Sequence, residues 1–185
     1  MTHYDMFGYP TLTPAPDGWG TTITSTAPIL DLTHSRCLEL SAHHEAAHVA
    51  VARDGGCTTG GVTYHGWDTP EAAASVESMA GPRDAVLVSV AAGWRAEVEW
   101  FRQEGLWTPE REWVAERRAA DGDRDQFDEF TDPASSMTWK SASGQADVAL
   151  AYLWPEVARM AEVLVSAWSA GRPFVSDEEL RETGR

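Results

Sequence analysis

The sequence predicts a mainly α-helical fold with a small β element. Two observations indicate the helices: apolar residues recur on one face of several stretches, and these stretches begin at capping residues and end at glycine. A third observation concerns size. The 185 residues are 43% hydrophobic and include nine tryptophans, which is enough to bury the core of one compact domain.

The chain divides into two parts of different composition. Residues 1–34 are rich in proline, threonine and glycine and show no helical period. We expect residues 35–185 to form a single domain with a charged insertion near 105–137. Within the insertion, Pro109 begins a helix to Ala120, and an acidic loop follows from Asp121 to Asp132. We interpret its acidic residues as a solvated face and hypothesise that the loop covers the active site.

The helix that we expect from Arg36 to Arg53 carries the most informative motif. It is rich in good helix formers, lacks proline and glycine, and ends at Gly55-Gly56. Its centre reads His44-Glu45-Ala46-Ala47-His48. At about 100° per residue, the two histidines lie only about 40° apart around the helix, so both rings can reach one ion.

This motif has the residue types of a zinc hydrolase centre. Zinc lowers the pKa of a bound water to about 7, and a neighbouring carboxylate can take its proton. We therefore predict Zn²⁺ as the cofactor, His44 and His48 as metal ligands, and Glu45 as the catalytic base. The pattern is short, and it also fits two core histidines bonded to carbonyl groups. A third ligand would favour the metal.

Three segments offer a third ligand. Asp54 lies six residues after His48, but on a continuous helix it points about 240° away, which excludes it. Glu97 and Glu99 lie on a second helix, expected from Asp84 to Gln103, and either could bind the metal or orient a histidine.

The remaining segment carries Asp147. Ser143 has the character of an N-cap, which would place Asp147 near the first turn of the following helix. From the residues alone, Asp147 and Glu97 both remain open as the third ligand. Later in that helix, Pro155 must interrupt or restart it. Ser176 and Glu179 then predict a capping box for a short last helix.

Three segments together resemble the peptidase domain of the FtsH family of ATP-dependent zinc metallopeptidases. They are the motif with Val49-Ala50, the run Ala92-Gly93-Trp94-Arg95-Ala96-Glu97, and Ser143-Gly144-Gln145-Ala146-Asp147. The resemblance implies a zincin-like FtsH-type fold, with zinc held by His44, His48 and Asp147. It makes Glu45 the base and Glu97 a supporting residue. Gly60 to His65 resembles the family's short strand and supplies the β element.

The sequence also departs from this family. Trp94 stands where the family has arginine, and Ala47 stands where it usually has glycine. The family joins its peptidase to an ATPase and usually to a membrane anchor. This chain has no GxxxxGK[ST] loop and no apolar run of about 20 residues. We therefore expect a peptidase-like domain that acts on peptides or unfolded protein segments, with a separate ATPase or regulatory protein as a further partner.

Charge and cysteine content limit the partners and the cellular compartment that we expect. A formal charge of −15 argues against nucleic acid as a partner, because a phosphate-binding surface needs an excess of basic residues. We expect no membrane partner, and two cysteines without a signal sequence predict a cytoplasmic protein. The main alternative is a non-catalytic protein-interaction module that retains a peptidase-like fold. A third hypothesis is a hydrolase of non-peptide amides.

Overall fold

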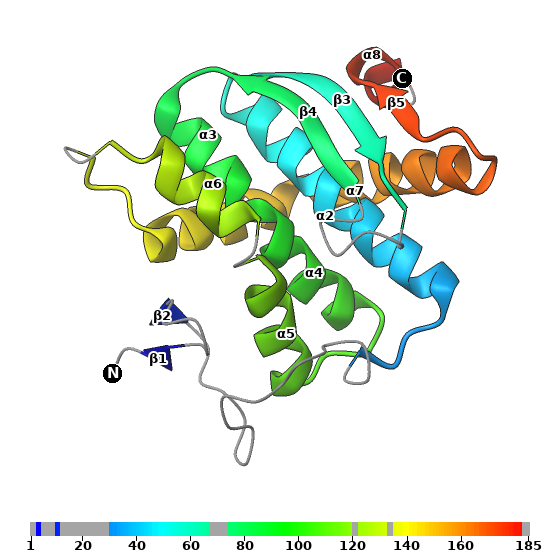
Figure 1. Cartoon of the computed structure of the whole chain (residues 1–185), viewed down its shortest axis with the longest axis horizontal. Coiled ribbons are helices and arrows are strands. Elements are labelled where there is room, and N and C mark those ends of the chain that lie inside the picture. The colour runs from blue at the N-terminus through cyan, green and yellow to red at the C-terminus, as the bar shows by residue number, and fades with distance from the viewer. Residues whose placement is uncertain are drawn as a thin grey trace.

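The computed structural model describes residues 3–4, 10–11, 30–66, 74–119, 122–132 and 135–182. These residues form a mainly helical fold with a small antiparallel sheet, as predicted (Figure 1). Of the first 29 residues, only the paired strands β1 (His3–Tyr4) and β2 (Pro10–Thr11) are described. Our expectations for the rest of that segment lie outside the described residues.

Helix α2 (His34–Asp54) carries the motif and is the central helix of the fold. It packs against α7, α4 and α3 and against the sheet, and its middle third is almost fully buried. Thr33 caps its start by accepting a hydrogen bond from the Arg36 amide, and Gly55 ends it. The expected helix is therefore confirmed, with bounds that differ by two residues at the start and one at the end.

The sheet lies beside α2 and has the strand order β4-β3-β5, with both pairs antiparallel. Its strands are β3 (Thr58–Tyr64), β4 (Ala74–Ala80) and β5 (Phe174–Ser176). Strand β3 confirms the expected β element. Gly61 is required at its centre, since its φ is 128° and a Cβ there would lie 2.5 Å from the Val175 carbonyl oxygen.

The helix expected from Asp84 to Gln103 is two helices. Helix α3 (Arg83–Val90) and helix α4 (Ala92–Gln103) are separated at Ala91, so the prediction of one continuous helix is wrong. The last carbonyl groups of a helix lack an intrahelical partner. Ser89 lies in the last turn of α3, and its carbonyl oxygen accepts a hydrogen bond from Nδ1 of His48.

The charged insertion is more ordered than expected. Helix α5 (Pro109–Ala119) matches the prediction, but the expected acidic loop contains helix α6 (Asp123–Phe130). Phe127 of α6 is only 2% exposed and packs on Trp139, which anchors the helix to the domain. Helix α6 lies against α3, on the side of the motif helix where the histidines point.

Helix α7 (Trp139–Ser169) begins earlier than expected and is one continuous helix. Its cap is Thr138, whose side chain accepts from the Ser141 amide, while Ser143 lies inside the helix and is buried. The helix also continues through Pro155. Ala151 loses an amide partner to this proline but is exposed, so water can satisfy its carbonyl group.

Two buried clusters hold these elements together. One joins α2 to α7, β3 and β5, and the other joins α4 to α5, α6 and the start of α7. The capping box of Ser176 and Glu179 is present at helix α8 (Asp177–Glu182), as predicted. In the part of the chain that the structure describes, no helix combines the length and apolar character needed to cross a membrane.

Candidate metal centre

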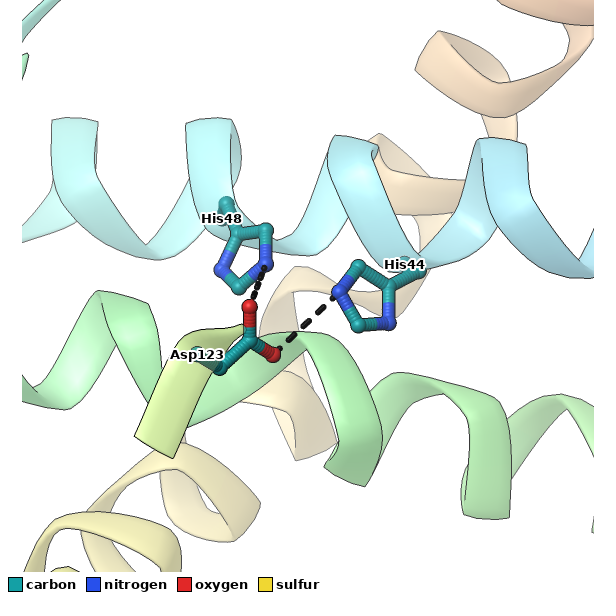
Figure 2. A group of neighbouring side chains, drawn as sticks. All are labelled: His44, His48 and Asp123. Carbon is teal, nitrogen blue, oxygen red and sulfur yellow. Dashed lines mark ion pairs between the residues drawn. The ribbon is translucent and has the colours of Figure 1, made fainter. Parts of the chain in front are cut away.

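The two motif histidines meet a single carboxylate. His44 and His48 point from the same face of α2, and Asp123 faces them from the first residue of α6 (Figure 2). Nε2 of His44 lies 3.3 Å from Oδ2 of Asp123, and Nε2 of His48 lies 3.5 Å from Oδ1. Each residue offers one ligand atom, and these three atoms lie within 4.8 Å of one another.

The other ring nitrogen of each histidine, Nδ1, already has a hydrogen-bond partner. Nδ1 of His44 lies 3.0 Å from Oε1 of Glu97, and Nδ1 of His48 lies 2.7 Å from the Ser89 carbonyl oxygen. A carboxylate and a carbonyl can only accept, so Nδ1 is the protonated nitrogen in each ring. In the neutral imidazole this leaves the Nε2 lone pair free, and both lone pairs point to the same region.

The spacing of these atoms is compatible with a bound ion. Ligand atoms at about 2.0–2.2 Å from a tetrahedral zinc lie about 3.3–3.6 Å from one another. The two Nε2-to-oxygen distances of 3.3 and 3.5 Å fall in that range. In addition, Oδ2 of Asp123 is buried and accepts no hydrogen bond from the described residues. Two imidazoles and one carboxylate are also a donor set that zinc commonly uses.

Gly93 provides the room that an ion would need. It lies in the first turn of α4, and a Cβ built there would be 2.5 Å from Nε2 of His44 and 2.6 Å from Nε2 of His48. Any side chain at this position would therefore fill the space in front of the two Nε2 atoms. Gly93 and Glu97 are four residues apart, so one face of α4 both clears this space and orients His44.

Burial and charge shift the titration of the whole cluster. Burial lowers the pKa of His44, but Asp123 and Glu97 more than offset it, and the pKa is raised well above its usual value. The pKa of His48 is raised as well, because Asp123 outweighs the effect of burial. Burial raises the pKa of Asp123, but the two histidines lower it overall. Without an ion, the three groups therefore favour a charged cluster of imidazolium and carboxylate.

Glu45 lies in the same environment and is 5% exposed. Its pKa is raised, mainly by burial, although the neighbouring histidines act in the opposite direction. A carboxylate with a raised pKa is a stronger base near neutral pH. Glu45 can therefore hold a proton taken from a nucleophile at this cluster.

The structure does not bring Asp147 to the histidines. Its carboxylate is 47% exposed, and Oδ1 accepts a hydrogen bond of 2.5 Å from Nε of Arg95. Because α7 begins at Trp139, Asp147 lies in the third turn of the helix instead of the first. Asp123 takes the position beside the two histidines that the resemblance gave to Asp147.

The other two candidate carboxylates, Glu97 and Glu99, have different contacts. Glu97 is 1% exposed and contacts Nδ1 of His44, in the supporting position that the resemblance implies, and Nη1 of Arg118 lies 3.4 Å from it. Glu99 accepts a hydrogen bond from Gln103 on the outer side of α4.

Asp123 was missed because it stands among many acidic residues. The interpretation of the whole stretch from Asp121 to Asp132 as solvated is wrong for this residue, whose side chain is only 15% exposed. One signal was present in the sequence: Phe127 follows Asp123 by four residues, which in a helix puts both on one face. The buried phenylalanine therefore marks the face that Asp123 shares.

Comparisons of this chain with protein-family models, with curated proteins and with solved structures found no match. The resemblance to the FtsH peptidase domain consequently rests on the quoted sequence segments alone.

Proposed function

We propose that this chain is a zinc-dependent endopeptidase of zincin-like type that cleaves peptides or unfolded protein segments. In this proposal His44, His48 and Asp123 hold the ion, and Glu45 is the catalytic base. The observation that carries it is the convergence of two Nε2 atoms whose rings are each fixed through Nδ1. Histidines that merely fill a core have no reason to share one carboxylate and one glycine-cleared space.

The protein residues would divide the chemistry as follows. Zinc, when bound, acidifies a water and polarises the carbonyl group of the substrate. Glu45 accepts a proton from the attacking water on its carboxylate and then donates it to the leaving amine. Glu97 and the Ser89 carbonyl keep the two imidazoles in the tautomer that presents Nε2.

The test is zinc content together with peptide cleavage. Elemental analysis of the purified protein should give about one zinc per chain, and His48→Ala should lose it. Glu45→Gln should retain the zinc but lose cleavage of a fluorescently labelled unfolded protein, because the amide cannot take up the proton. Zinc-free wild type after refolding with zinc, or undiminished cleavage by Glu45→Gln, would contradict the proposal.

The deep burial of the cluster favours one alternative. Glu45 is 5% exposed and His48 is 7% exposed, and structural zinc sites are closed whereas catalytic sites keep an open position. A protein-interaction module with structural zinc would bind one ion per chain and show no cleavage in wild type. The same two measurements therefore separate the two functions.

A further inference from the structure

A cavity of about 470 Å³ lies among α2, α4 and α7, on a different face of α2 from the metal cluster. His43 lines it, and this residue is about 100° around the helix from His44. The volume is within the range of pockets that hold small ligands, which is roughly 300–1,000 Å³. Nothing in the proposed hydrolase chemistry uses this cavity.

Aromatic rings form one part of its wall. The ring of His43 stacks on Trp154, with centroids 5.5 Å apart and planes at 23°, and its centroid lies 6.2 Å from that of Trp100. Nδ1 of His43 donates to the Glu39 carbonyl oxygen, which fixes the imidazole ring in its stack on Trp154. Three aromatic side chains from three helices therefore converge on one hollow.

Carboxylates form the other part of the wall. Glu39, Glu104 and Glu162 all line the cavity, and among the described residues the guanidinium that pairs with them is Arg36, which lies 2.5 Å from both Glu39 and Glu104. Three carboxylates against one guanidinium leave an excess of two negative charges. Among the described residues, Glu162 has no hydrogen-bond or ion-pair partner.

The wall also shows which kind of cation it suits. The Arg36 guanidinium carbon lies 4.7 Å from the centroid of Trp100, so a cation already sits over one of these rings. Glu39 and Glu104 each accept a hydrogen bond from Arg36. They therefore contribute to the cavity mainly the negative electrostatic potential of their charges. A cation that needs an electrostatic field and aromatic contacts, and few hydrogen bonds, therefore matches the wall best.

We propose that this cavity binds a methylated ammonium group against the aromatic wall of His43, Trp100 and Trp154, with Glu162 as the uncompensated charge in that wall. Quaternary ammonium groups cannot donate hydrogen bonds and are recognised by aromatic rings in this way. The same group occurs on small free cations and on methylated lysine side chains, and the cavity chemistry is shared by both. This site is independent of the metal cluster and of the proposed hydrolase activity.

Isothermal titration with choline, compared with its neutral isostere 3,3-dimethylbutan-1-ol, tests the charge requirement. We expect choline to bind and the isostere to bind at least about tenfold more weakly, since the isostere lacks the cation–π and ionic attraction. A lysine peptide with and without trimethylation then separates the two sources. Tighter binding than choline by the trimethylated peptide indicates a side chain, and tighter binding by choline indicates a free cation.

Two variants locate the bound cation. Trp154→Leu should weaken choline binding by roughly tenfold, with folding checked by circular dichroism. Glu162→Gln lies on the exposed side of α7 and should weaken it about threefold without affecting the fold. Glu178→Gln on α8 makes the same charge change away from the cavity and should leave binding unchanged.

Three results would overturn the proposal. One is the absence of choline binding to wild type, and another is equal affinity for choline and its isostere. The third is wild-type affinity in both Trp154→Leu and Glu162→Gln, which would place the bound cation elsewhere. Zinc content should be the same in all these variants, so a failure here is distinguishable from a failure of the metal site.

Discussion

Asp123 is the first residue of α6 and Asp147 lies in the third turn of α7, and the two aspartates have different neighbours. Asp147 lies in a region where an arginine is within reach, and Arg95 holds its carboxylate at the surface. Asp123 faces two imidazoles, and one of its oxygens is buried without a hydrogen bond. The difference lies in the neighbouring groups: Asp147 pairs with a guanidinium, which keeps its charge, whereas Asp123 faces two imidazoles, which can lose theirs.

The largest expected effect is on zinc binding when each aspartate is changed in turn. Asp123→Asn should weaken zinc binding by more than the roughly 10–100-fold typical of a lost supporting residue, because it removes a ligand charge. Asp147→Asn should leave zinc binding at the wild-type level, since only the bond to Arg95 is lost. Competition with a chromogenic zinc chelator measures both. The opposite pattern would restore Asp147 as the ligand.

The second largest expected effect is also on zinc binding, and it compares Gly93, beside the two histidines, with Gly144, on α7 near Asp147. Gly93→Ala should weaken zinc binding strongly, because the added methyl group would lie about 2.5 Å from Nε2 of both histidines. Gly144→Ala adds the same methyl group to α7, one turn before Asp147, where it would meet none of the described residues outside its own stretch of helix within 4 Å. It should leave zinc binding unchanged and stabilise the helix by up to about 1 kcal/mol.

Zinc titration and thermal unfolding of both glycine variants provide the measurement. Equal zinc affinity in Gly93→Ala and wild type would show that the space in front of the histidines is not where an ion binds. Because Gly144→Ala makes the same substitution in a helix, a loss of zinc from both variants would point to a general effect on the fold.

A smaller effect should come from the residue that orients His44. Glu97→Gln keeps the size of the side chain but weakens its hold on Nδ1, and should lower zinc affinity by about 10–100-fold. Glu99→Gln on the same helix is the matched control and should have no effect, because Glu99 contacts Gln103. If both substitutions act equally, net charge and not the orientation of His44 explains the loss.

The smallest expected effect is on the pH dependence of stability, and it comes from Asp177. Like Asp147, this aspartate pairs with arginine side chains, those of Arg53 and Arg181. Burial raises the pKa of Asp177, but hydrogen bonds from Thr59, Arg53 and Arg181, with the charge of Arg53, lower it overall. A lowered pKa in the folded state means a stabilising contribution that is present above the unfolded pKa of about 3.9 and is lost as the pH falls through the folded value.

We therefore expect Asp177→Asn to reduce the pH dependence of the unfolding free energy below about pH 4 without changing zinc content at neutral pH. Urea unfolding at a series of pH values measures the slope. A steeper slope in the variant than in wild type would contradict this account. Together with Asp147, this residue separates carboxylates that hold the fold from the one that faces the histidines.

Local signals in the sequence were sufficient for much of the fold. The α2 helix, the helix from Pro109 and the capping box before α8 were all predicted from helix formers, caps and glycines. The break at Ala91 and the continuity through Pro155 were not, because both depend on tertiary packing and solvation that override local preference. The start of α7 was misplaced because two residues in this region, Thr138 and Ser143, can each cap a helix.

The candidate site was predictable to the extent that it lies on one helix. Spacing alone put His44, Glu45 and His48 together, and Glu97 was placed near them by the resemblance. The third carboxylate comes from another element, and local sequence says little about which aspartate the folded chain will bring close. Asp147 pairs with Arg95, and a pairing across 52 residues is not visible in a single sequence.

Gly93 also bears on how relatives of this chain could be told apart. Conserved histidines and acids can persist in a lineage that has lost the ion, because they also fill the core. A glycine persists at a helix position only under selection for the space it leaves, since alanine would make the helix more stable. A glycine followed four residues later by glutamate, on a helix that faces the HExxH motif, would therefore distinguish lineages that still bind metal from those that keep only the scaffold.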